Sequence, residues 1–362
     1  MCAASERWPA GALAFFLFMT FATGRAVGTE APESTQVAPP TLHDTELYVA
    51  PGSLDIDPSH LGFAPQYPLW TDGASKRRWI SLPPGTAIDA GDPDLWVFPV
   101  GTRFWKEFAF NGRPVETRYM ERKEDGSWLF ATYAWDANGQ TATLVADRGI
   151  LRAHEFDDGI AHAIPSQTDC TACHVSGRSP VLGFSALQLS DDRDPNALHA
   201  EPAPPPDLTL SLLVDRGLIA GLDRYFVLAP PRTSTASSLQ RTALGYLHGN
   251  CGHCHNPYGP LNRLGLYLRQ SGDPGRSAAL STTFRMPLVR PPAGILLGTE
   301  FRIAPGDPHS SAIPQRVAAR GTALQMPPIG TARVDAEAVE LINRWITEAR
   351  IPQPSAQPNV SN

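Results

Sequence analysis

Two short stretches of the sequence carry cysteine and histidine at the same spacing. They are Cys170-Thr171-Ala172-Cys173-His174 and Cys251-Gly252-His253-Cys254-His255. Two thiols separated by two residues can each add to a vinyl group of one porphyrin, and the imidazole of the next residue then lies beneath the iron. Each stretch therefore predicts one covalent haem c. Its two cysteines are the attachment points, and His174 or His255 is the proximal iron ligand.

Other chemistries of paired cysteines fit these stretches less well. Zinc sites built from two CxxC pairs usually have about 15 to 20 residues between the pairs, whereas residues 174–250 separate Cys173 from Cys251. A thioredoxin-like redox pair needs no following histidine and is not expected twice. Apart from Cys2, the two stretches use every cysteine of the chain. Two covalent haems are the prediction, with zinc or redox disulfides as alternatives.

The sixth iron ligands must come from elsewhere in the sequence. Met326 stands before two prolines, which matches the placement of the distal ligand in cytochrome c domains, and Met286 competes with it. Thioether sulfur is a soft donor that raises the reduction potential of a haem. For the first haem, His199 is the candidate sixth ligand, and an open position is equally allowed. The other available donors are Met120, His154 and His162.

The N-terminal segment has the pattern of a secretory signal. Arg7 gives a positive start, residues 10–21 are apolar, and Ala26-Val27-Gly28 offers a cleavage site. The apolar run is well short of the roughly 20 residues that span a bilayer, and no second candidate follows. We expect residues 1–28 to be removed together with Cys2. The mature chain is then predicted to be periplasmic or secreted, without a membrane span.

Charge and composition limit the class of partner. The formal net charge is −6, and only three lysines are present. No basic run is visible, so nucleic acid is not an expected partner. The expected partner is a redox protein, either a dehydrogenase or another cytochrome.

The segments around the two stretches differ in pattern. Residues 29–58 are a Pro-rich linker without periodicity. Residues 59–155 alternate apolar and polar side chains between Asn111-Gly112, Asp125-Gly126 and Asn138-Gly139, which predicts antiparallel hairpins. Six of the eight tryptophans lie in this module, where core packing is the expected role and a ligand platform the alternative. We predict a sandwich-like all-β module.

Helical patterns follow the β module. Pro165 prevents a long helix from leading into Cys170, so residues 156–235 form a first haem region of unusual type. Residues 236–350 have a helix capped by Ser237 or Ser238 that leads into Cys251, and a second helix starting at Asp335. Two helices flanking a haem in this order predict a cytochrome c-like domain. Residues 351–362 are a Pro-rich tail predicted to be loose.

The fold class expected from these patterns is mixed and multidomain, with an N-terminal all-β module followed by mainly α haem regions. Residues 236–350 resemble class I cytochrome c domains, and about residues 60–350 resemble a family of secreted bacterial dihaem c-type cytochromes. The runs that carry the wider resemblance are residues 63–78, 82–86, 98–102, both cysteine-histidine stretches, residues 304–311 and 326–328. This resemblance implies haem binding and electron transfer in the cell envelope.

Electron transfer by a periplasmic dihaem protein is thus the expected function, and enzymatic activity is left undecided. One alternative is a dihaem peroxidase-like oxidoreductase with an open first haem. Another is the electron-accepting subunit of a periplasmic dehydrogenase, with a ligand-binding β module.

Overall fold

The computed structural model describes residues 38–175, 178–205, 207–233, 235 and 237–349. The predicted signal segment 1–28 and the tail 351–362 lie outside the described residues, as does the first part of the 29–58 linker. All described residues belong to one compact unit. None of its helices is both long enough and apolar enough to cross a bilayer.

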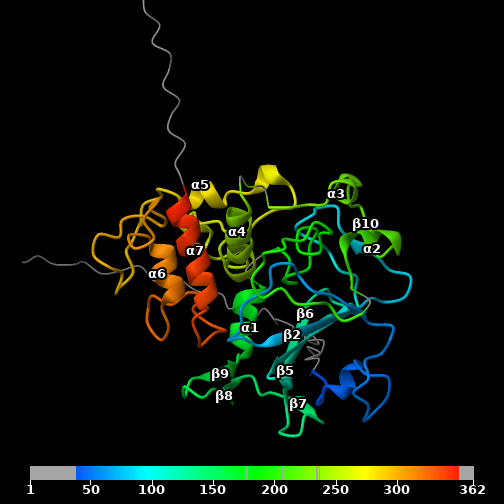
Figure 1. Ribbon diagram of the computed structural model, residues 1–362. Coiled ribbons are helices and arrows are strands. Elements are labelled where there is room, and N and C mark those ends of the chain that lie inside the picture. Colours follow the sequence, from blue (N-terminus) through cyan, green and yellow to red (C-terminus); the bar gives the residue numbers. More distant parts are fainter. Residues whose placement is uncertain (1–37, 176–177, 206, 234, 236, 350–362) are drawn as a thin grey trace, which may run out of the picture. The chain divides into compact units, whose positions relative to one another are not determined.

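A six-stranded antiparallel sheet occupies the region where alternation predicted hairpins (Figure 1). In spatial order its strands are β1 (Leu61–Gly62), β2 (Ser75–Ser81), β4 (Arg103–Phe110), β5 (Arg113–Arg122), β6 (Trp128–Trp135) and β7 (Ala142–Leu144). Asn111 and Gly112, both with positive φ, form the turn between β4 and β5. A two-residue turn of this kind matches the twist of the strands it joins. The predicted hairpin at Asn111-Gly112 is confirmed.

The two faces of this sheet have different neighbours. One face packs Trp79, Trp105, Tyr119 and Tyr133 against Leu42 and other residues of the segment before the sheet. Trp79 and Trp105 are 2% and 1% exposed. These aromatic side chains are core residues, which is the role expected for them from the sequence. The opposite face contributes side chains to a second core cluster and to a cavity described below.

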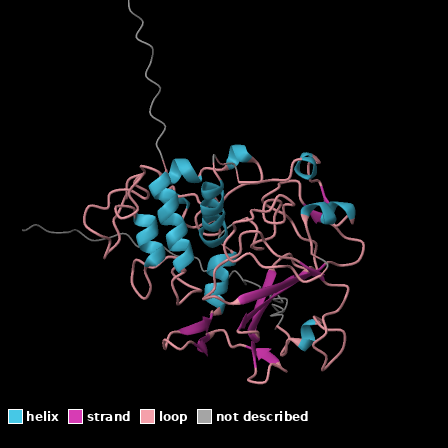
Figure 2. Cartoon of the chain, viewed as in Figure 1, coloured by secondary structure: helices cyan, strands magenta, loops and turns pink. Residues whose placement is uncertain are grey.

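The expectation of a sandwich is wrong. Besides the large sheet, the described residues form only two-stranded sheets: β3 (Ile88–Asp89) with β10 (Ile219–Ala220), and β8 (Ile150–Glu155) with β9 (Ala161–Ile164). Loops and short helices take the place of a second large sheet against the first (Figure 2). Alternation along a strand shows that one face is buried, but it does not show what covers that face.

The expectation of mainly α haem regions is also wrong. The helices are α1 (Gln167–His174), α2 (Leu210–Asp215), α3 (Tyr225–Leu228), α4 (Ser238–Cys251), α5 (Ala279–Thr283), α6 (Ala312–Ala318) and α7 (Ala336–Glu348), with 3-10 turns at His43–Thr45, Asn262–Leu264 and Pro274–Arg276. Among the helices of the described residues, only α4 and α7 are longer than eight residues. The sequence holds 36 prolines and 30 glycines, and such residues end helices and favour turns. Loops therefore make up most of the described residues after β9.

The two long helices begin where the sequence predicts. The Ser237 hydroxyl accepts a hydrogen bond from the Gln240 N–H at 3.2 Å and caps α4. The Asp335 carboxylate accepts from the Ala338 N–H at 3.1 Å and caps α7. Helix α7 packs on both α4 and α6 (Figure 1) and buries Leu341, Ile342 and Trp345 between them. Both predicted helices are confirmed, and their contact holds the end of α4 in place.

Helix α4 also packs closely against the segment before β2. A Cβ atom added at Gly245 would overlap the ring of Tyr67. Overpacking of this kind typically costs about 1 to 3 kcal/mol. We therefore expect Gly245→Ala to lower the free energy of unfolding by about 2 kcal/mol, measured by denaturant titration.

Gly272→Ala is the matched control for this change. A Cβ atom at Gly272 would meet its neighbours at 3.5 to 3.6 Å, which is ordinary van der Waals contact. Equal stability of the two variants would show that α4 does not need its close approach to Tyr67.

Candidate functional site

Both cysteine-histidine stretches line one cavity of about 360 Å³. The residues that line it include all four cysteines, His174 and His255, although the two stretches are far apart in sequence. Met326 and the two prolines after it also line the cavity. Its remaining wall includes side chains from one face of the sheet: Arg78, Phe104, Lys106, Arg118, Met120, Phe130 and Thr132. A volume of a few hundred Å³ with mainly apolar walls is typical of a cofactor or ligand site.

Helix α1 positions the first stretch. Pro165 stops the helix from extending upstream, and Ser166 with Asp169 forms a capping box at its start. The sequence prediction that no long helix leads into Cys170 is confirmed. The ring of His174 lies 5.1 Å from that of Phe130 on β6, so the last turn of α1 faces the sheet.

The ring of His174 has a defined proton position. Its Nδ1 lies 2.6 Å from the carbonyl oxygen of Pro180. A carbonyl only accepts, so Nδ1 carries the proton and Nε2 keeps its lone pair. Burial lowers the pKa of His174 to about 4, so the ring is neutral at pH 7. A neutral imidazole with its second nitrogen held by a carbonyl is the form that binds a metal through Nε2.

The end of helix α4 positions the second stretch. Asn250, just before Cys251, accepts a hydrogen bond from the Trp70 N–H at 2.7 Å and donates one to the Pro68 carbonyl at 3.3 Å. His255 is 8% exposed, and burial lowers its pKa to about 4. Within the described residues Nδ1 of His255 has no hydrogen-bond partner. The orientation of this ring is therefore less firmly set by the protein than that of His174.

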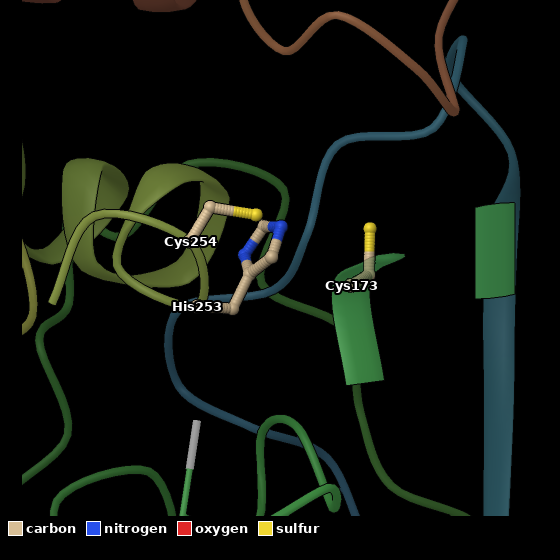
Figure 3. A group of neighbouring side chains, drawn as sticks. All are labelled: Cys173, His253 and Cys254. Carbon is tan, nitrogen blue, oxygen red and sulfur yellow. The ribbon is translucent and has the colours of Figure 1, made fainter. Parts of the chain in front are cut away.

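The two stretches meet at three side chains. Cys173 at the end of α1 faces His253 and Cys254 beyond α4, and one donor atom of each lies within 4.8 Å of the others (Figure 3). In the described part of the chain none of the four sulfurs is in a disulfide. Hydrogen bonding to Cys254 and burial raise the pKa of the Cys173 thiol, and burial raises that of Cys251 to about 12. Redox-active CxxC pairs show the opposite shift, to a lower pKa.

A short loop holds Met326 at the cavity. The Met326 N–H donates to the Arg316 carbonyl of α6 at 3.0 Å. Beyond the prolines, the Asp72 carboxylate accepts hydrogen bonds from the hydroxyl of Thr331 and from the N–H groups of the next two residues, at 2.7 to 2.9 Å. The competing Met286 does not line the cavity. Of the two methionines considered from the sequence, only Met326 is brought to the two stretches.

The structure does not bring His199 to the cavity. Its Nε2 lies 2.8 Å from the Asp335 carboxylate, and its ring lies 4.7 Å from that of Trp70. Asp335 is also the cap of α7, so His199 supports the start of that helix. His154 stacks on Phe110 at 4.4 Å. Of the donors considered for the first haem, only Met120 on β5 lines the cavity.

One further histidine, His248, lies beside the second stretch. His248 lines the cavity, and its Nδ1 accepts a hydrogen bond from the Gln270 N–H at 2.9 Å. The proton of this ring is therefore on Nε2, which makes that nitrogen a donor rather than an iron ligand. Burial lowers the pKa of His248 to about 3, so the ring is neutral. It suits a role in donating a hydrogen bond into the cavity.

A buried chain of charges connects the sheet with the Met326 loop. Nδ1 of His162 lies 2.9 Å from the Asp72 carboxylate, and Nε2 lies 3.0 Å from the Glu116 carboxylate. Glu116 also pairs with Arg118 at 2.8 Å. All three members of the Asp72–His162–Glu116 chain are at most 1% exposed. With a carboxylate at each nitrogen, the imidazole is held as a cation.

The sequence did not reveal that three charged residues of the sheet, Arg78, Lys106 and Arg118, line the cavity. They fall at polar positions of alternating strands, which normally predict a solvated face. Their shared parity with Phe104 and Met120 was the available signal, because alternate residues of a strand lie on one face.

Comparison with protein-family models, curated proteins and solved structures finds no match to this chain. The residues present nevertheless fit a covalent haem in each stretch: paired thiols, a neutral imidazole after each pair, a thioether donor and an apolar cavity.

Proposed function

We propose that this chain is a dihaem c-type cytochrome that transfers electrons in the periplasm or outside the cell. One observation carries the proposal: both CxxCH stretches and Met326 line a single cavity. The resemblance of the sequence to secreted dihaem cytochromes supports the same function. The proposal assigns Cys170 and Cys173 to one haem and Cys251 and Cys254 to the other.

In this proposal the residues of the chain hold and tune the haems. Bound haem iron supplies one-electron oxidation and reduction. His174, with its proton on Nδ1 and its ring anchored to Pro180, offers Nε2 to the first iron. His255 and Met326 act as the ligand pair of the second iron, and a thioether ligand raises its reduction potential. The expected partner is another redox protein.

The closeness of Cys173 and Cys254 supports transfer between the two sites. Each sulfur would be joined to the edge of its own porphyrin, and these two sulfurs lie within 4.8 Å of each other. The two ring edges would then be neighbours. Electrons that enter at one haem would reach the other without crossing a layer of protein.

Haem content after export from a bacterial cytoplasm tests the proposal. We expect two haems per chain in a pyridine haemochrome assay, with colour that acid-acetone does not extract. The double variant Cys170→Ala/Cys173→Ala and the double variant Cys251→Ala/Cys254→Ala should each retain one haem, a twofold loss. Mass spectrometry that finds four unmodified sulfurs in exported protein would reject the proposal.

A second candidate is a metal site without porphyrin. Cys173, His253 and Cys254 form a set of soft donors of the kind that binds zinc or monovalent copper. Metal analysis of purified protein separates the two candidates. Zinc or copper near one ion per chain, lost in His253→Ala and Cys173→Ala, supports this site; iron near two per chain supports the haems.

A further inference from the structure

Three cationic side chains lie in one row across neighbouring strands of the sheet. The register pairs Arg78 of β2 with Lys106 of β4, and Lys106 with Arg118 of β5. Directly opposite side chains on one face of a sheet are about 5 Å apart at Cβ, and like charges there are destabilising. All three line the cavity that holds both CxxCH stretches. A fold that keeps this basic row, defined as Arg78, Lys106 and Arg118, needs anions to balance it.

The protein supplies anions to the two ends of the basic row. Glu116 accepts from Arg118 at 2.8 and 3.0 Å, and Glu201 accepts from Arg78 at 3.3 Å. Glu116 also neutralises His162, so its charge is shared between two cations. The two carboxylates therefore leave positive charge at the centre of the row.

Among the residues that the structure describes, no carboxylate forms an ion pair with Lys106 at the centre of the basic row. Lys106 Nζ lies 4.8 Å from the centre of the Phe108 ring, and within the described residues it donates no hydrogen bond. Beside it, Arg78 is 4% exposed and its Nη2 has no hydrogen-bond partner among the described residues. A buried guanidinium nitrogen without an acceptor is costly. Two donors of adjacent strands thus have no acceptor within the described residues, and both of their residues line the cavity.

The electrostatics of Lys106 lead to the same conclusion. Burial, then the charges of Arg78, Arg118 and Lys76, lower the pKa of Lys106 well below its usual range, and Glu201 opposes them. An anion held against the ammonium would favour its charged form.

We propose that the basic row binds a carboxylate inside the cavity, with the ammonium of Lys106 and Nη2 of Arg78 as donors. Two sources of this group are open to experiment. A haem propionate is the expected one, and in that form the inference rests on the proposed function. A small diffusible carboxylate is the other, and that form does not need the haems.

Lys106→Gln in the full-length exported protein tests the inference. The change removes the charge but keeps most of the side-chain volume. Lys123→Gln is the matched control, because Lys123 follows β5, pairs with Glu121 at 3.2 Å and does not line the cavity. Haem content is measured first, then the reduction potential of each haem, and then the binding of formate by calorimetry.

The outcomes separate the two sources. A cation beside a haem disfavours the ferric form, so with a bound propionate Lys106→Gln should lower the equilibrium constant for reduction of one haem at least tenfold, about 59 mV for one electron. The Lys123→Gln protein should keep both potentials, and no variant should bind formate. Formate binding that weakens tenfold in Lys106→Gln identifies a diffusible carboxylate instead. Behaviour of Lys106→Gln equal to that of Lys123→Gln in both measurements overturns the inference.

Failure of the proposed function gives a different result. Protein exported without haem rejects the cytochrome proposal and the propionate form together. The formate titration then decides the inference alone, because a diffusible carboxylate is the one remaining source when no haem is present.

Discussion

Met326→Ala is expected to remove the thioether-to-iron absorption of one haem and to lower its reduction potential by on the order of 100 mV, since axial ligands set haem potentials over about 0.8 V. Met326 lines the cavity that both stretches share. Alanine has no donor atom at this position, so in the proposed cytochrome the sixth coordination site of that iron would open or take water. Visible absorption of the oxidised protein and a redox titration measure the two effects.

Met286→Ala is the control for this experiment. Met286 lies between Thr283 and Arg302 in the backbone hydrogen-bond pattern and does not line the cavity. It should leave both the absorption and the potential unchanged. If Met286→Ala, and not Met326→Ala, removes the band, the assignment of the sulfur ligand is wrong.

His162→Gln is expected to lower the free energy of unfolding by about 3 to 5 kcal/mol, because removing one partner of a buried ion pair leaves an uncompensated charge. Burial opposes the charged form of Asp72, but its hydrogen bonds from His162 and from the backbone of Arg333 and Ala332 lower its pKa. Burial also opposes the charged form of Glu116, yet Arg118 and His162 lower its pKa to about 2. Both carboxylates are thus ionised in the folded protein at neutral pH.

The pH dependence of this effect follows from two pKa shifts, those of His162 and Glu116. Burial would lower the pKa of His162, but its bonds to Asp72 and Glu116 raise it above the ordinary 6.5. The stability from His162 is therefore complete below 6.5 and is lost as pH rises through the raised pKa. The stability from Glu116 is complete above its ordinary pKa of 4.5 and is lost as pH falls toward about 2. The Asp72–His162–Glu116 chain is most stabilising between these limits.

Urea titrations at about pH 5.5 and about pH 9 measure the pH dependence of the His162→Gln effect. The difference between wild type and His162→Gln should be larger at the lower pH. His309→Gln, at an exposed position, should change stability by less than about 0.5 kcal/mol. A difference that grows toward alkaline pH would contradict a protonated His162 in the folded state. Because Asp72 also holds residues 331–333, loss of the Met326 absorption in His162→Gln is expected as well.

Local features of the fold were predictable because short-range chemistry determines them. Ser237 and Asp335 start helices through their own side-chain oxygens, and Asn111-Gly112 makes its turn through backbone conformation. Pro165 limits the helix before Cys170 for the same local reason. The class of the fold was not predictable in this way. Many loops pack by contacts between distant segments, such as Trp70 with Asn250, and leave no periodic signal.

The candidate site also combines features that neighbouring residues determine with features that depend on contacts between distant segments. The spacing of each CxxCH stretch is a local signal, and so is the position of Met326 before two prolines. That Cys173 meets Cys254 is a tertiary contact, which one sequence does not reveal. The placement of His199 depends on Asp335, far along the chain. The basic row depends on strand register, so its three members come together only when β2, β4 and β5 pair.

The closeness of Cys173 and Cys254 has a consequence for biogenesis. If the chain is exported as proposed, two thiols within 4.8 Å of each other would stand in an oxidising compartment, where they would be prone to form a disulfide. In the proposed cytochrome, a disulfide at this place would block both attachment reactions at once, since each sulfur would be joined to a different porphyrin. On the proposed function, haem attachment would have to precede final closure of the polypeptide, and the newly exported chain would have to be kept open and reduced until both haems were in place.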